Sequence, residues 1–454
     1  MEPRDVRTID DAIAIVEELQ LTHVKVGIFD IDGIMRGKYM SREKFISSLK
    51  KGFGFCDVVL GWDSNDNLYD NVKFTGWHTG YPDAPARIIP ESCRELPFED
   101  TLLFIAEFAP PADTVGPRAA LRRVVDKAEK MGFKAFAAVE LEFFVFTETP
   151  DSVREKGYRN LQPVAPGNFG YSVLRNSTHS DLYEMVLRTA EIMDMPIEGL
   201  HEETGPGVLE AALAVDDIMS AGDKASLFKT FTKVACQKAG YMAAFMAKWS
   251  EKYPGQSGHI HMSLQNLDGT SAFYKEDGRY TMTETMEQFV AGCQVLMPEM
   301  LVMLAPTVNS FTRLVPGAWA PTSATWGLEN RTTALRVIQG GPSSQRMEHR
   351  VGAADINPYL GLAAVLACGL YGIENKLKLG EPIQGNAYEA DIPAELTLPA
   401  TLTEAADRFE ASTAARDAFG DAFVEHFAAS RRWEEREFRK AVTDWELQRY
   451  FEII

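Results

Sequence analysis

Three segments of the sequence place charged, imidazole or hydroxyl side chains at every second position. They read Val139-Glu140-Leu141-Glu142-Phe143, His259-Ile260-His261-Met262-Ser263 and Arg346-Met347-Glu348-His349-Arg350. Residues two apart in a β-strand lie on the same face of the sheet. As strands, these segments would present carboxylates, imidazoles and guanidinium groups on one face, which are groups that bind metal ions and phosphates.

The acidic pair is the most informative of the three, because the residues around it are apolar. The sequence reads AFAAV up to residue 139 and FFVF from residue 143. Carboxylates buried in such a run need a charge partner or a metal ion. Alone, an acidic pair most often marks a solvated strand face, and a His-x-His pair is more often structural than metal-binding. Together the segments predict a shared site.

Two further segments add acidic and basic groups. The segment HEETGPGVLE contributes Glu202, Glu203 and Glu210 around a Gly-Pro-Gly turn, and residues 312–337 contribute three arginines. Carboxylates with one imidazole suit Mg²⁺ or Mn²⁺ better than zinc, and arginines facing those metals indicate a polyphosphate between them. No P-loop or Rossmann glycine motif is present. The residues predict metal-dependent phosphoryl transfer, with a two-metal hydrolase as the alternative.

The remaining patterns predict a chain of two unequal domains. Residues 10–21 have the spacing of an amphipathic helix, and residues 24–40 read as strand, Asp-Gly turn and strand, hence a hairpin. The stretch APPADTVGPR, residues 109–118, marks a boundary. A helix ending at Gly132 and the acidic strand follow it, then alternating helices and strands to about residue 376 and a polar helical tail. We expect domains at 1–112 and 113–454.

Composition excludes several classes of protein. The chain has 65 acidic and 46 basic residues, a net charge of −19, which argues against nucleic acid or an anionic membrane as a partner. Five scattered cysteines without a Cys-x-x-Cys motif predict no disulfide framework, and the charged start lacks a signal peptide's apolar stretch, so we expect a cytoplasmic protein. Residues 356–373 carry no charge, but they begin with Asn-Pro and contain two glycines, which favours a buried core helix over a membrane span.

Taken together and in order, the motifs resemble those of the glutamine synthetase superfamily, class I-like. They are the acidic pair, HEETGPGVLE, SGHIHMSL, NSFTRLVPG, ENRTTALRV and RMEHRVGAADINPYL. The resemblance implies an α+β protein with an N-terminal β-grasp domain and a C-terminal catalytic domain, built as an antiparallel sheet barrel with helices. It also implies a double-ring dodecamer with active sites between neighbouring subunits.

The resemblance implies a role for each matching residue, with ATP, Mg²⁺ or Mn²⁺, glutamate and a nitrogen nucleophile as ligands. Glu142, Glu203 and Glu210 match the ligands of one metal ion, and Glu140, His259 and Glu348 match those of a second. His261, Ser263, Arg336 and Arg346 match positions of the ATP site. Arg313, Arg350 and the Gly255 backbone match the glutamate site, and Arg331 matches the group that stabilises the transferring phosphoryl. The implied intermediate is γ-glutamyl phosphate.

The sequence departs from ammonia-using members in the flap over the substrate. Those members carry a Glu where this chain has Trp319, in RLVPGAWAP. An indole cannot accept a proton from ammonium, but it can pack on an apolar substituent or hold an alkylammonium by a cation–π contact of about 0.5–2 kcal/mol. Asp63 is the nearest match to the ammonium-side Asp of the N-terminal domain. The pattern resembles the γ-glutamylpolyamine and γ-glutamylamide synthetases of amine catabolism, which predicts an ATP-dependent glutamate–amine ligase.

Several alternatives stay open from the sequence. They are an ammonia-using glutamine synthetase, a catalytically silent structural or regulatory homologue and the hydrolase. The amine is also open: the aromatic residues Trp62, Tyr69, Phe74, Trp77, Trp319 and Trp326 favour a hydrophobic or aromatic monoamine, although at least four of them are expected in the core or at subunit interfaces. Asp63, Asp66 and Asp70 would suit a polyamine. Tyr388, in a loop resembling the adenylylated loop of regulated synthetases, is expected to be structural.

Overall fold

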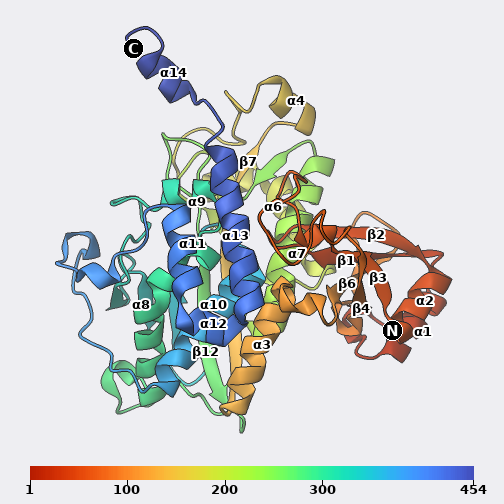
Figure 1. Ribbon diagram of the computed structural model, residues 1–454, viewed down its shortest axis with the longest axis horizontal. Helices are drawn as coiled ribbons and strands as arrows, with labels where there is room; N and C mark the ends of the chain where they lie inside the picture. The colour runs from red at the N-terminus through yellow and green to blue at the C-terminus, as the bar shows by residue number, and fades with distance from the viewer.

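The computed structural model describes residues 1–454, which form an α+β protein with two separate sheets (Figure 1). The N-terminal sheet has the order β2-β1-β6-β4-β3, with β5 beside β6. Its strands are β1 (His23–Phe29), β2 (Met35–Ser41), β3 (Phe53–Cys56), β4 (Asp83–Ile88), β5 (Arg94–Glu95) and β6 (Leu102–Phe108). Helices α1 (Ile9–Glu18) and α2 (Arg42–Lys51) pack with this sheet, and the predicted hairpin is confirmed as β1 and β2.

Strand β6 joins the two parts of the molecule, because both of its faces are buried. Leu102, Phe104 and Ala106 belong to the core of the N-terminal sheet, whereas Leu103 and Ile105 belong to the large core of the second sheet. This follows from the alternation of side chains along a strand. The N-terminal sheet is therefore packed against the rest of the chain through one face of β6.

The second sheet has nine strands in the order β13-β14-β15-β12-β7-β9-β8, with β10 and β11 also beside β7. They are β7 (Phe133–Phe146), β8 (Ile197–Glu202), β9 (Val208–Leu213), β10 (Asp216–Asp217), β11 (Met242–Ala244), β12 (Gly258–Asn266), β13 (Trp326–Leu328), β14 (Leu335–Ile338) and β15 (Arg346–His349). All pairs are antiparallel except β13 with β14. No pairing joins the edge strands β13 and β8, so within this chain the expected antiparallel sheet barrel is present as an open, curled sheet.

Helices cover the apolar face of this sheet. The long helices are α3 (Pro117–Lys130), α6 (Ser180–Ile192), α7 (Ile218–Lys238), α8 (Glu284–Leu304), α10 (Pro358–Glu374) and α13 (Asp421–Phe438). Shorter ones are α4 (Pro150–Glu155), α5 (Val173–Thr178), α9 (Val308–Arg313), α11 (Leu402–Ala411), α12 (Thr413–Phe419) and α14 (Asp444–Tyr450). The predicted uncharged helix is confirmed as α10, which is buried and packs on α8, α3 and α7.

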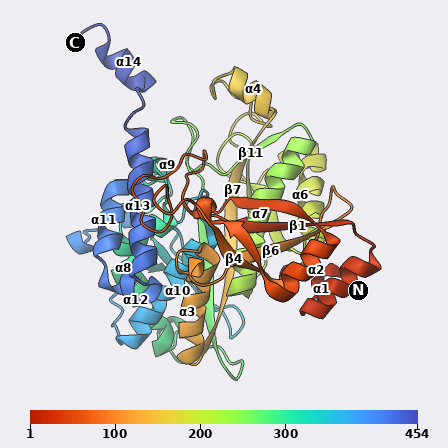
Figure 2. The ribbon, with the colours of Figure 1, turned by 45° about the vertical axis from the view of Figure 1, so that its right-hand side comes forward.

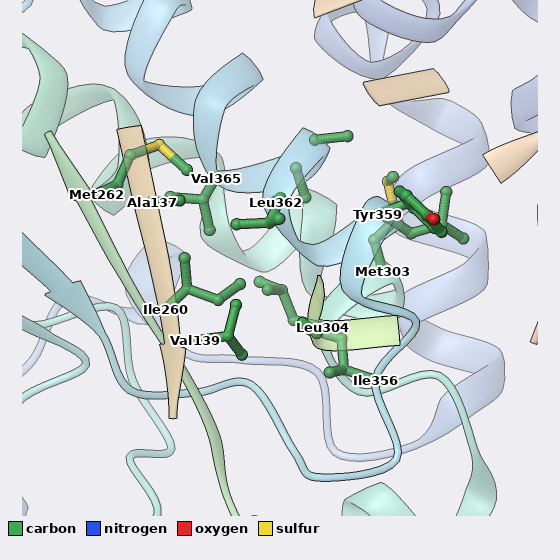
Figure 3. Packing of buried hydrophobic residues seen from close by; sticks show 14 of the residues in the cluster. Ala137, Val139, Ile260, Met262, Met303, Leu304, Ile356, Tyr359, Leu362 and Val365 are labelled. Carbon is green, nitrogen blue, oxygen red and sulfur yellow. The ribbon is translucent and has the colours of Figure 1, made fainter. Parts of the chain in front are cut away.

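Figure 3 shows how the core fixes the sheet. Val139 of β7 and Ile260 of β12 face Leu362 and Val365 of α10 across an apolar contact. The same alternation that buries Val139 turns Glu140 to the opposite face. No helix of the molecule has the length and apolar composition that crossing a membrane requires.

Candidate functional site

The polar face of the second sheet brings the three predicted segments into register. Glu140 lies opposite His259 of β12, and Glu142 lies opposite Glu210 of β9. Farther across the sheet, Glu348 of β15 lies between His261 of β12 and Arg336 of β14. Residues that are up to about 200 positions apart in sequence thus share one surface because antiparallel pairing aligns their strands.

A cavity of about 430 Å³ opens on this face. Twelve of the predicted site residues line it: Glu140, Glu142, Glu203, Glu210, Gly255, His259, Arg313, Trp319, Arg331, Arg336, Glu348 and Arg350. Four do not: His261, Ser263, Arg346 and Asp63. Most of the predicted site residues are therefore brought together in one cavity by a single chain.

The four residues outside the lining fall into two groups. His261 and Arg346 adjoin the cavity, since His261 Nε2 lies 3.0 Å from Glu140 Oε1 and Arg346 Nε donates to His261 Nδ1 at 3.1 Å. Ser263 lies farther along β12, opposite Phe136. Asp63 is buried elsewhere, where its carboxylate accepts hydrogen bonds from the backbone of Asn65 and Asn67 and from the Trp433 indole at 3.1 Å. Its predicted role at the amine is not tested by one chain.

The carboxylates of the site repel one another. Burial, together with the charges of Glu142 and Glu140, raises the pKa of Glu210 to about 10. Burial works against ionisation of Glu140 too, but the imidazoles of His259 and His261, whose nitrogens lie 3.4 and 3.0 Å from its carboxylate oxygens, hold its pKa well below the usual range. An anionic cluster of this kind is stabilised by a cation, which lowers the pKa of its ligands.

The buried imidazole nitrogens of the site indicate that this cation is a metal ion. Both nitrogens of His259 are buried and make no hydrogen bond, which is costly unless another group binds them. Three sets of side chains converge closely enough to share an ion: Glu140 with His261 and Glu348, Glu140 with Glu210 and His259, and His201 with Glu203 and Glu210. The residues present thus fit one or more divalent cations.

His201 and Tyr171 were missed by sequence reasoning. His201 Nε2 lies 3.2 Å from Glu203 Oε1 and 3.6 Å from Glu210 Oε1, and the Tyr171 ring stacks on its imidazole at 4.5 Å. His201 could have been found, because it begins the HEETGPGVLE motif two residues before Glu203. Tyr171 lies in a loop with no periodicity, so nothing in the sequence indicated it.

The arginines form a second cluster beside the acidic one. Arg313 is buried, donates to the carbonyls of Val351 and Arg350, and packs so tightly on Gly255 that a Cβ there would lie 2.5 Å from Arg313 Cγ. Arg350 and Arg336 both donate to Glu348. The cavity is therefore acidic on one side and basic on the other.

Trp319 lies at the mouth of the cavity with 59% of its surface exposed. Its φ of +56° is a left-handed backbone conformation in the turn after Gly317. Of the six aromatic residues considered for amine recognition, it alone lines the cavity. Tyr69 and Trp326 are buried, and Trp77 is exposed but makes an edge-to-face contact with Tyr81.

Comparison with known proteins accounts for this arrangement. The family model "Glutamine synthetase, catalytic domain" matches residues 114–450. The chain belongs to the glutamine synthetase family. Its fold is also that of ligand-free GmaS, a solved structure with 24% identity and a TM-score of 0.83 over 97% of this chain and 99% of that one.

Three relatives in the glutamine synthetase family carry different names. A protein of Dictyostelium discoideum called type-1 glutamine synthetase 2 is 45% identical over 95% of this chain and 84% of its own. The glutamate–isopropylamine ligase of a Pseudomonas species is 37% identical over 97% of each chain. The γ-glutamylethanolamide synthetase of Streptomyces coelicolor is 36% identical over 98% of this chain and 96% of its own.

The raised pKa of Glu210 predicts how metal affinity depends on pH. At pH values below its pKa of about 10, the Glu210 carboxyl is protonated when no metal is bound, so an incoming cation must displace this proton. We expect the affinity for Mn²⁺, measured by calorimetry, to rise by up to about tenfold per pH unit for one released proton. Because burial and repulsion oppose ionisation of Glu210 only in the folded state, the free energy of unfolding of the metal-free protein should fall as pH rises toward 10. Mn²⁺ should restore it.

Glu210→Gln is the matched variant, since it keeps the shape and removes the titrating group. It should bind Mn²⁺ more weakly and without the additional pH dependence. Equal proton release by the variant and the natural protein, measured in buffers of different ionisation enthalpy, would contradict this assignment.

Proposed function

We propose that this member of the glutamine synthetase family is an ATP-dependent ligase that joins the γ-carboxylate of glutamate to an organic amine, in amine catabolism. The observation that carries the proposal is the cavity itself. It combines an acidic cluster suited to divalent cations with an arginine cluster suited to carboxylates and phosphate, and Trp319 stands at its mouth in place of an acid. The names of two relatives, a glutamate–isopropylamine ligase and a γ-glutamylethanolamide synthetase, support it.

In this proposal the acidic side of the cavity holds Mg²⁺ or Mn²⁺, which neutralises phosphate charge when bound. The ligands are the two sets implied by the resemblance: Glu142, Glu203 and Glu210 for one ion, and Glu140, His259 and Glu348 for the other. His201 adjoins the first set. ATP lies beside the second, near His261, Ser263, Arg336 and Arg346.

The basic side of the cavity orients glutamate. Arg313 and Arg350 hold its carboxylates, because both are buried guanidinium groups at the cavity wall. The Gly255 backbone receives its amino group. Arg331 is exposed and free to approach the γ-phosphoryl as it moves to the glutamate carboxylate, where a guanidinium stabilises the developing charge. Trp319 covers the resulting γ-glutamyl phosphate and excludes water until the amine attacks.

The contacts favour a monoamine with an apolar substituent over a polyamine. A polyamine needs carboxylates at the entrance, and within one chain each of the three candidates already has another partner. Asp66 pairs with Arg36 at 2.6 Å, Asp70 pairs with Arg436, and Asp63 accepts from Trp433. The indole of Trp319 remains as the group that an amine substituent would meet.

An ammonia-using glutamine synthetase is the second candidate, because the relative with 45% identity bears that name. Trp319 argues against it, since an indole provides no base for ammonium. A silent homologue is the third, but no side chain of the implied metal and arginine sets has been replaced.

The test is phosphate release from Mg-ATP and glutamate with a panel of amines. The panel contains ammonia, isopropylamine, ethanolamine, an arylamine, putrescine and spermidine at equal concentrations. We expect an apolar or small monoamine to give the highest kcat/KM. Ammonia as the best substrate would replace the ligase proposal with the glutamine synthetase, and no turnover with any amine would favour the silent homologue.

The domain organisation and assembly are also proposals. A separate core of 24 buried residues lies within residues 6–115, which supports an N-terminal β-grasp domain at 1–112 and a catalytic domain at 113–454. We propose a cytoplasmic double-ring dodecamer with sites completed by neighbouring subunits. Helix α14 supports an assembly, because it projects from the body of the chain (Figure 2) and exposes Trp445, Leu447 and Tyr450.

Removal of residues 441–454 should therefore disrupt the assembly. The segment makes few contacts with its own chain, so the remaining fold should persist, while its apolar side chains would lose their place on another subunit. Light scattering of the truncated and full chains measures the mass of each. An unchanged mass would show that α14 does not hold subunits together.

A further inference from the structure

Glu329 contacts the site from outside the cavity, through an arginine of the cavity wall. Its Oε2 accepts hydrogen bonds from Arg336 Nε at 3.2 Å and from Arg336 Nη2 at 2.6 Å. Arg336 lines the cavity with a side chain that is 13% exposed, whereas the Glu329 side chain is 45% exposed and is not part of the lining. Any contact of Glu329 with the site is therefore made through this arginine.

The backbone at Glu329 has a conformation that glutamate rarely adopts. Its φ is +49°, in the left-handed region that favours glycine, asparagine and aspartate. The residue directly follows β13, and its N–H donates to the carbonyl of Val337 in β14 at 3.0 Å. A strained position that carries a long charged side chain, where glycine would fit without strain, indicates that the side chain itself has a role.

The carboxylate of Glu329 is fixed at both of its oxygens. While Oε2 binds Arg336, Oε1 accepts the backbone N–H of Gln339 at 3.1 Å, one residue beyond the end of β14. The bend at Glu329 thus turns its side chain back over β14. Because the backbone already holds the carboxylate, its ion pair with Arg336 loses less side-chain entropy than a pair of two free side chains.

Arg336 is shared between Glu329 and Glu348. Arg336 and Glu348 lie directly opposite each other in β14 and β15, and Arg336 Nη1 donates to Glu348 Oε2 at 3.2 Å. The other oxygen of Glu348 accepts from Arg350. Glu348 belongs to the second ligand set proposed above, so each further donor that turns to it competes with a cation. This competition is strong because the Glu348 side chain is 2% exposed and water screens it little.

We propose that Glu329 is a positioning residue that holds Arg336 back from Glu348, so that this carboxylate stays available to a divalent cation. Glu329 occupies Nε and Nη2 of the guanidinium and leaves Nη1 against Glu348. Without Glu329, the freed nitrogens would turn to the carboxylate across the strand pair, and Arg336 would neutralise a metal ligand. The inference rests on the proposed ligand set, but not on the ligase activity or on the amine.

Calorimetric titration with Mn²⁺ alone tests this role without turnover, and the binding step that Glu348→Gln weakens is the one to follow. We expect Glu329→Gln to weaken this step by about three- to tenfold, because the amide keeps an oxygen for the Gln339 N–H but cannot also hold the guanidinium. Arg336→Met should have the opposite effect and strengthen the step, since it removes the cation that competes for Glu348.

The double variant separates positioning from a direct effect of charge. If Glu329 acts through Arg336, the variant with both changes should bind Mn²⁺ as Arg336→Met alone does. A direct effect of the lost charge would instead weaken Mn²⁺ binding as much in the Arg336→Met background as in the natural protein, and this result would overturn the inference. An unchanged affinity in Glu329→Gln, with a weakened one in Glu348→Gln, would overturn it as well.

Two further variants check the fold and the specificity of the effect. Glu329→Gly suits the left-handed backbone, so it should fold, and it should weaken Mn²⁺ binding as Glu329→Gln does. Glu404→Gln is the matched control. Glu404 is 42% exposed and also binds an arginine and a backbone N–H, Arg408 at 2.7 Å and Ala400 at 3.0 Å, but lies outside the cavity. It should leave Mn²⁺ affinity unchanged.

Glu348→Gln distinguishes a failure of this inference from a failure of the proposed ligand set. Normal Mn²⁺ binding by that variant would show that Glu348 is not a ligand, and would overturn the ligand set and the positioning role together. Weakened binding by Glu348→Gln confirms the ligand, and the Glu329 variants then decide the positioning role alone.

Discussion

Replacement of Arg331 by alanine should lower kcat by about 10³-fold or more, the range expected for losing a guanidinium that stabilises a transferring phosphoryl group. The side chain is exposed, and only its backbone carbonyl is used, as the acceptor for Arg350 Nε at 3.1 Å. The fold should therefore be unaffected. Rapid-quench measurement of ADP formation in a single turnover, with enzyme in excess over Mg-ATP and glutamate saturating, measures phosphoryl transfer separately from product release.

Arg188→Ala is the matched control, because that arginine is also exposed and makes no hydrogen bond or ion pair, but lies on α6 outside the cavity. It should leave turnover unchanged. Arg331→Lys keeps the charge without the planar fork and should recover only part of the rate. Normal turnover in Arg331→Ala would mean that this guanidinium does not meet the phosphoryl group.

Trp319→Glu should shift preference from organic amines toward ammonia. The change removes an apolar surface and a cation–π partner worth about 0.5–2 kcal/mol, and it adds a carboxylate that can bind ammonium. Because 1.4 kcal/mol corresponds to tenfold, the ratio of kcat/KM for the best amine to that for ammonia should fall by about tenfold or more. Competition between the two nucleophiles in one reaction, read by mass spectrometry of the products, gives this ratio directly.

Two control variants accompany this experiment. Trp319→Phe keeps an aromatic face and should retain the amine preference. Trp77→Ala removes another exposed indole, 80% accessible and outside the cavity, and should change nothing. An unaltered product ratio in Trp319→Glu would show that Trp319 does not determine the choice of amine.

The strands of the site could be predicted because their polar side chains recur at every second position, which is the period of a β-strand. Glu140 and Glu142 alternate with Val139 and Leu141, so face and burial could be read before the structure was known. The pairing of these strands could not be derived from the residues, since register depends on partners far along the chain. Family resemblance grouped the residues into ligand sets but gave no strand pairing.

The loops were predicted less well, because no period constrains them. Tyr171 gave no signal, and Asp63 could be noticed as an acidic residue but not as one that hydrogen bonds to Trp433, 370 residues later. The degree of closure of the second sheet could not be predicted for a related reason. Whether two edge strands meet is decided by the curvature of the whole sheet, which no local pattern reports.

The pleat of β7 has a consequence for how this enzyme can change its substrate. A slip of one residue would exchange Val139 and Leu141 for Glu140 and Glu142 in the core, so the acidic strand is tied to folding itself. The flap around Trp319 carries no such constraint. Diversification toward new amines should therefore be confined to the rim of the cavity, leaving the phosphoryl-transfer apparatus inherited intact from one specificity to the next.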